Sequence, residues 1–129
     1  MFSPPDPHDA YHLFMTEIRV FDWPRTVRWY VETLGLRSLV NDEPNGFALL
    51  GAGQGRLALR RGVARCEAVY HARLHFRVAD VDAERARLLA AGVPVTEAVE
   101  NDRESYREVR LTDPEGTAIT LFTWSKPAQ

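Results

Sequence analysis

The sequence contains very little lysine and cysteine, and it has no large excess of charge of either sign. Only one of its 16 basic residues, Lys126, is a lysine, and the formal net charge is −2 over 129 residues. A general nucleic-acid binder carries a strong basic excess, so that class is not expected. The single cysteine, Cys66, excludes an intrachain disulfide and suits a reducing compartment.

Long hydrophobic runs are also missing. No apolar stretch approaches the roughly 20 residues that a membrane-spanning helix needs. Residues 1–9 have neither the basic nor the apolar region of a secretory signal, and their prolines predict an extended lead-in. We therefore expect a single-domain cytoplasmic protein without a membrane segment.

Arginine supplies the other 15 basic residues, and two explanations of this bias remain open. Arginine and alanine both have GC-rich codons, and alanine is equally frequent, so a GC-rich genome would produce the bias. Alternatively, some arginines bind a planar anion, because the guanidinium fork suits this better than an ammonium group.

Two segments of the chain follow one pattern, which is an alternating β-like run, an aspartate, a helical stretch and a glycine. In order, these are Phe14–Val20, Asp22 and Gly35 in the first segment, and Ala72–Val78, Asp80 and Gly92 in the second. The aspartates, or Asp82 in the second segment, are suited to cap a helix, and a glycine commonly ends one.

Helical spacing predicts one apolar stripe in each segment. The stripes are Val27, Tyr30, Val31 and Leu34 in the first, and Ala86, Leu89, Ala90 and Val93 in the second. Short β-like runs follow each helix: Arg37–Val40, Gly46–Leu50 and Arg56–Arg60, then Val95–Val99, Tyr106–Thr112 and Thr117–Trp124. Each half therefore reads as β-α-β-β-β, and the glycine-rich stretch 51–55 reads as a hairpin loop.

These segments, above all Tyr30-Val31-Glu32-Thr33-Leu34-Gly35 and Asp113-Pro114-Glu115-Gly116, resemble the vicinal oxygen chelate superfamily of glyoxalases, extradiol dioxygenases and bleomycin resistance proteins. The resemblance implies an α+β fold in which two βαβββ modules form one curved mixed sheet with helices on the convex side. It places the modules at 13–62 and 72–124, with a lead-in at 1–12 and a linker at 63–71, in one domain overall. It also implies a homodimer.

Metal-dependent members of this superfamily carry four ligands, and the resemblance aligns those positions with Met15, Ala58, Arg73 and Thr120. None of the four suits a divalent metal, since a guanidinium has no lone pair to give and a thioether is soft. His75 and Glu17 alone are too few for a zinc site. We therefore expect no metal and no cofactor.

Strand alternation predicts which side chains line the concave face. The predicted ligand-binding residues are Met15, Glu17, Arg19, Arg56, Arg60, Arg73, His75, Arg77, Thr120, Phe122 and Trp124. Arginines and aromatic rings in this arrangement favour a small organic ligand, an anionic aromatic molecule above all. The leading hypothesis is a metal-free binding protein. The alternative is an enzyme, similar to a lyase, isomerase or dioxygenase, that uses His75 or Glu17 as a base or a non-standard metal site.

Overall fold

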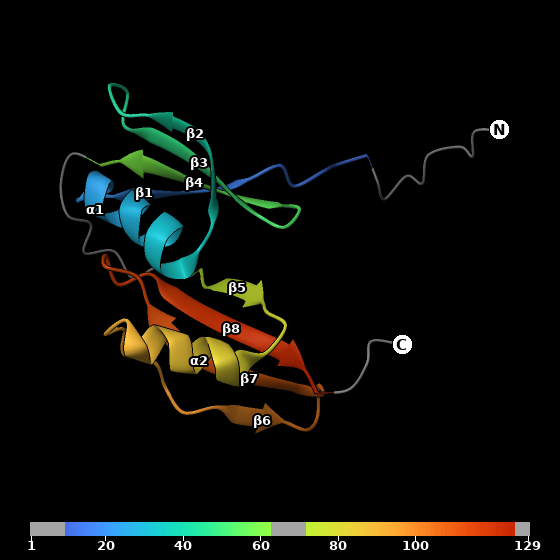
Figure 1. Ribbon diagram of the computed structural model, residues 1–129. Coiled ribbons are helices and arrows are strands. Elements are labelled where there is room, and N and C mark those ends of the chain that lie inside the picture. The colour runs from blue at the N-terminus through green and yellow to red at the C-terminus, as the bar shows by residue number, and fades with distance from the viewer. Residues whose placement is uncertain (1–9, 63–71, 126–129) are drawn as a thin grey trace.

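The structure is a computed structural model that describes residues 10–62 and 72–125, and the strands of this part form two four-stranded sheets (Figure 1). The first sheet contains β1 (Thr16–Val20), β2 (Arg37–Asp42), β3 (Phe47–Ala52) and β4 (Gly55–Arg61). The second contains β5 (Leu74–Arg77), β6 (Val99–Asn101), β7 (Tyr106–Thr112) and β8 (Ala118–Trp124). The spatial orders, β1-β4-β3-β2 and β5-β8-β7-β6, repeat one topology.

The α+β class and the two βαβββ modules are confirmed. In each module the first strand pairs in parallel with the last, and the remaining neighbours are antiparallel. Within the described residues, however, no strand ladder joins the two sheets into the single sheet that was expected. The predicted linker 63–71 and most of the lead-in 1–12 lie outside the described residues.

The helix of the first module consists of α1 (Trp23–Arg28) continued by the π-helix η2 (Trp29–Leu34). Asp22 caps α1 as predicted, since its side chain accepts a hydrogen bond from the backbone N–H of Arg25. Gly35 ends η2 with a φ of +96°, a backbone conformation that favours glycine. The helix and its two terminal residues were thus correctly predicted.

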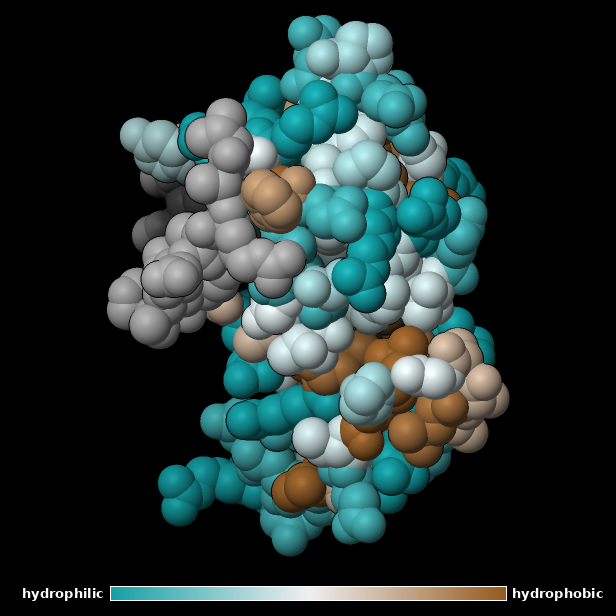
Figure 2. All heavy atoms as spheres, turned by 90° about the vertical axis from the view of Figure 1, so that its left-hand side faces the viewer, coloured by the Kyte–Doolittle hydropathy of each residue, from teal (hydrophilic) through white to brown (hydrophobic). Residues whose placement is uncertain are grey.

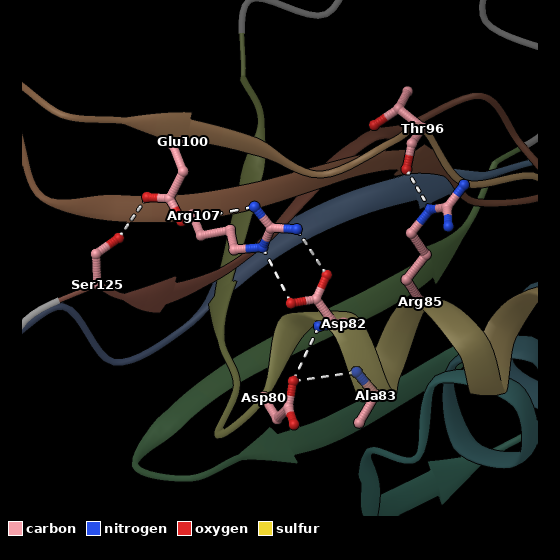
Figure 3. A network of polar contacts seen from close by, with 8 residues as sticks. All are labelled: Asp80, Asp82, Ala83, Arg85, Thr96, Glu100, Arg107 and Ser125. Atoms are coloured by element: carbon pink, nitrogen blue, oxygen red, sulfur yellow. Dashed lines mark hydrogen bonds and ion pairs between the residues drawn. The ribbon is translucent and has the colours of Figure 1, made fainter.

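Arg107 on β7 holds α2 (Val81–Ala90) against the second sheet (Figure 3). Its guanidinium donates to both carboxylate oxygens of Asp82, at 2.9 and 3.0 Å, and also pairs with Glu100 of β6 at 3.5 Å. Asp80, rather than Asp82, caps the helix. Asp82 is therefore free to bind Arg107, and this hydrogen bond lowers the pKa of Asp82.

The apolar stripe predicted for α2 is wrong. Ala86, Leu89 and Ala90 are exposed, whereas Val81 and Leu88 are buried. Val81 and Leu88 are seven residues apart and share one face of α2. The helix buries this face and leaves Leu89, a side chain as large as Leu88, 43% exposed.

The predicted strand Val95–Val99 is also wrong, because β6 begins only at Val99. Thr96 still contacts β7, where its backbone N–H donates to the Arg110 carbonyl at 3.0 Å, but its other groups do not continue a regular ladder. Its hydroxyl accepts the backbone N–H of Arg110 at 2.9 Å, and its carbonyl accepts Arg85 Nε at 2.9 Å. This part of the chain is therefore tied to β7 and α2 without being a regular strand.

One continuous core joins the two modules. The buried apolar cluster contains Val20, Trp23, Val27, Tyr30, Ala48, Leu50, Leu57, Leu59, Val81, Leu88, Val109, Leu111, Ile119 and Leu121. Tyr30 of η2 reaches the second module, where its hydroxyl donates to the buried Asp113 carboxylate at 2.6 Å. Figure 2 shows that apolar residues also gather on part of the outer surface of the second module, while the first is mainly hydrophilic on that face.

Candidate functional site

A groove of about 1540 Å³ lies between the two modules. Figure 1 shows β5 at the edge of the second sheet that is nearest the first module, and this edge forms one side of the groove. The first module contributes Leu34–Arg37, Leu39 and residues 51–56. The second contributes His75–Val78, Glu84, Leu121, Phe122 and Trp124. The volume exceeds the roughly 300–1,000 Å³ of common small-molecule pockets, so the groove is broad enough for an organic ligand.

The groove brings together five of the eleven predicted ligand-binding residues: Arg56, His75, Arg77, Phe122 and Trp124. The other six, Met15, Glu17, Arg19, Arg60, Arg73 and Thr120, are not among the residues that line it. The prediction assumed one curved sheet, on which all of these side chains would face a common concavity. The groove instead takes Arg56 from the first sheet and the other four from the second, while residues farther along the same strands, such as Arg60 and Thr120, do not line it.

On the first sheet, Glu17 and Arg60 satisfy each other. Arg60 Nε donates to Glu17 Oε1 at 2.9 Å, and its guanidinium also lies over the Phe47 ring at 4.9 Å. Strand register explains the contact. Glu17 pairs with Ala58, and Arg19, the next residue of β1 on that face, pairs with Arg60. This arginine and this carboxylate are therefore partners rather than free binding groups.

The four positions that the superfamily uses for metal ligands do not form a metal site here. Arg73 donates from Nη1 to Thr120 Oγ1 at 3.4 Å, which places a cation at the point where two ligands would be needed. Ala58 is fully buried and offers no donor atom. Among residues 10–62 and 72–125, no three His, Cys, Asp or Glu side chains are grouped for metal binding. The donor set of this chain does not fit the family's divalent metal.

Three arginines from three strands line the groove: Arg37 of β2, Arg56 of β4 and Arg77 of β5. In the described part of the chain, no carboxylate pairs with any of them, although Arg56 stacks on the Phe14 ring at 4.6 Å. The acidic residue of the lining, Glu84, is already bound to Arg87 at 2.8 Å. The lining is therefore locally positive in a protein whose net charge is slightly negative.

Arg37 was missed by the sequence reasoning. Its strand was predicted, but the face on which it lies was not assigned. Strand register gives the missing signal, because Arg37 pairs with Gly51 and Gly51 pairs with Arg56. Directly paired residues point to the same side of a sheet, so Arg37 and Arg56 flank Gly51 on one face.

An aromatic cluster lies at the other side of the groove. The Phe122 and Trp124 rings meet edge to face, with centroids 5.2 Å apart, and Tyr106 contacts both rings at 6.1 and 6.5 Å. Arg77 pairs in register with Phe122, so a guanidinium and an aromatic ring are neighbours. Trp124 remains 43% exposed, which leaves ring surface accessible to a ligand.

Two βαβββ modules around an intermodule groove define the glyoxalase/bleomycin-resistance class of folds within the vicinal oxygen chelate superfamily. The family model of the glyoxalase-like domain matches residues 15–122, and the chain belongs to that family. A search of curated protein sequences finds no match.

Solved structures share this fold at low sequence identity. An integron cassette protein, HFX_CASS4, from the mobile metagenome of a Halifax Harbour sewage outfall is 21% identical with a TM-score of 0.76, covering 87% of this chain and 97% of that one. TnmS3, an antibiotic binding protein from Streptomyces sp. CB03234, is 25% identical with a TM-score of 0.72, covering 91% and 98%. Lactoylglutathione lyase from Agrobacterium tumefaciens is 19% identical with a TM-score of 0.72, covering 89% and 95%.

Helices of the described residues are short and mixed in polarity, and none has the length and apolar character required to cross a membrane.

Proposed function

We propose that this chain binds a small, planar organic anion in the intermodule groove, without the help of a metal ion. The observation that carries the proposal is the set of groove arginines, Arg37, Arg56 and Arg77, to which the described residues supply no carboxylate partner. A guanidinium group binds a carboxylate through two parallel, charge-assisted hydrogen bonds. An organic acid would supply the charge that the lining lacks.

The aromatic cluster supports a planar ligand. Phe122 and Trp124 present ring surface to the groove, beside Arg77. Small-molecule sites commonly combine such apolar walls with a few fixed polar groups. The likeness to TnmS3, a protein described as antibiotic binding, agrees with a binding role for this fold.

The enzymatic alternative has less support. It relied on His75 and Glu17 as candidate bases, but only His75 lines the groove. Glu17 is held on the first sheet by Arg60 at 2.9 Å. We therefore favour binding over catalysis.

A thermal-shift experiment with chelator-treated protein tests the proposal. Two ligands of nearly equal shape, 2-naphthoate and 2-naphthamide, separate the effect of charge from that of the ring. At about 100 times its dissociation constant a ligand stabilises the native state by about 2.7 kcal/mol, so 2-naphthoate should raise the Tm by several degrees and 2-naphthamide far less.

The control uses two arginine variants. Arg77→Gln removes a groove arginine and should reduce the shift, whereas Arg103→Gln removes an arginine in the turn between β6 and β7, outside the groove lining, and should leave it unchanged. Equal shifts with the acid and the amide, or a shift that requires added divalent metal, would contradict the proposal.

A further inference from the structure

We infer that the Arg37–Gly51–Arg56 row is a subsite for a dianionic phosphate group, so that the groove selects aromatic phosphate monoesters over aromatic monocarboxylates. This inference rests on the proposed function and adds the chemical class of the ligand. It is carried by the geometry of three neighbouring strands and by the charges around them.

The row crosses three strands, with Arg37 on β2, Gly51 on β3 and Arg56 on β4. Adjacent strands lie about 4.8 Å apart, so the Cα atoms of the two arginines are separated by about 10 Å. Because Gly51 has no side chain, no polar group of the middle strand stands between the guanidinium groups. The Leu39 side chain covers Gly51, and the two long arginine side chains can extend past it toward one group between them.

The space over Gly51 has an apolar floor. A Cβ atom built on Gly51 would lie 3.3 Å from Leu39 Cδ1, so the Leu39 side chain covers this glycine. Leu39 offers no hydrogen bond and no charge to compete with a ligand. An anion between the two arginines would therefore be bound by the guanidinium groups alone on this side.

The two arginines differ in how they are held. Arg56 stacks on Phe14 with 4.6 Å between its guanidinium carbon and the ring centroid, which orients the group while its N–H donors remain in the plane. Arg37 is exposed and has no ion pair or side-chain hydrogen bond within the described residues. Binding would thus order Arg37 beside a preoriented Arg56.

Charge and geometry together favour phosphate over carboxylate. A single arginine can donate to both oxygens of one carboxylate. A carboxylate bound in this way would leave the second arginine without a partner. A phosphate monoester carries a charge of about −1.5 to −2 at pH 7 and three acceptor oxygens, which matches two guanidinium groups. The aromatic part of the same molecule would then extend toward Phe122 and Trp124.

Isothermal titration calorimetry with chelator-treated protein tests this with three probes: phenyl phosphate, benzoate and inorganic phosphate. We expect phenyl phosphate to bind roughly tenfold or more tightly than benzoate, as loss of one charged hydrogen-bonding partner would suggest. Inorganic phosphate should bind more weakly than phenyl phosphate, because it lacks the ring.

Arg37→Gln should weaken phenyl phosphate binding by roughly tenfold and benzoate binding by less than about twofold, while Arg103→Gln changes neither. Arg37→Lys, which keeps the charge but loses the fork, should restore only part of the affinity.

The outcomes separate this inference from the function on which it rests. Equal affinity for benzoate and phenyl phosphate, with no effect of Arg37→Gln, would overturn the phosphate subsite and leave anion binding intact. Equal affinity for inorganic and phenyl phosphate would overturn the ester class. Binding of none of the three probes would overturn both.

Discussion

Tyr30 and Asp113 link the two modules through a hydrogen bond that is shielded from water at both ends. Burial, with the charge of Asp113 beside it, raises the pKa of Tyr30 far above its ordinary value, so the hydroxyl always keeps its proton to donate. Asp113 Oδ1 accepts the backbone N–H groups of Glu115 and Thr117, and Oδ2 accepts the tyrosine. The Asp113 carboxylate thus stabilises its own turn and also binds η2 of the first module.

Tyr30→Phe should lower the free energy of unfolding by about 1–3 kcal/mol, because it leaves a buried acceptor without one partner. Urea denaturation followed by far-UV circular dichroism measures the loss. Tyr106→Phe is the matched control, since the Tyr106 hydroxyl only accepts from Asn101 in a half-buried position; its cost should stay below about 1 kcal/mol. Equal stability of Tyr30→Phe and the wild type would show that the link contributes nothing.

Single residues also show how far a sequence can predict a site. Alternation placed Arg56, His75 and Arg77 among the ligand-binding candidates, and these do line the groove. It could not show that Arg60 is paired with Glu17, because that contact joins residues 43 positions apart through strand register. The same limit explains Arg37, which only the pairing of β2 with β3 places beside Arg56.

Among the elements, α2 shows where local pattern and tertiary packing differ. Its N-terminal cap was foreseen, because an aspartate before a helix acts within a few residues. Its buried face was not foreseen, because packing against the sheet decides that Val81 and Leu88 are buried. Arg107 of β7 also binds the first turn of the helix. Patterns within one element predict its ends better than its orientation.

The ion pair of Asp82 with Arg107 should make part of the stability depend on pH. The hydrogen bond from Arg107 lowers the pKa of Asp82 in the folded protein. The stabilisation is therefore fully present above the ordinary aspartate pKa of about 3.9, and it is lost as the pH falls through the lowered folded-state value.

Asp82→Asn should lower the Tm slightly at pH 7, with the difference closing only below about pH 3.9. Melting curves between pH 7 and strongly acidic conditions measure this convergence. Asp102, in the turn after β6, makes no ion pair within the described residues, so Asp102→Asn should track the wild type throughout. A difference for Asp82→Asn that persists unchanged in acid would assign the effect to something other than this carboxylate's charge.

At the scale of the whole molecule, the groove is a product of how two similar modules pack. The repeat in the sequence predicted both modules, because each is built from local turns, caps and alternation. Their relative placement depends on long-range contacts such as Tyr30 with Asp113 and Arg87 with the Thr33 carbonyl at 2.8 Å. The predicted single sheet failed for this reason, and with it the assumption that all the polar strand faces share one cavity.

The most direct test of the central claim, metal-free binding of an organic anion in the groove, is an NMR titration of chelator-treated protein with 2-naphthoate. Tryptophan indole N–H signals provide the readout. Trp124 lines the groove, whereas the Trp23 indole is buried and donates to the Leu59 carbonyl at 2.9 Å. We predict saturable shifts of Trp124 and of residues 51–56, with Trp23 unchanged. Shifts centred instead on Glu17 and Arg60, or binding only after a divalent metal is added, would contradict the account.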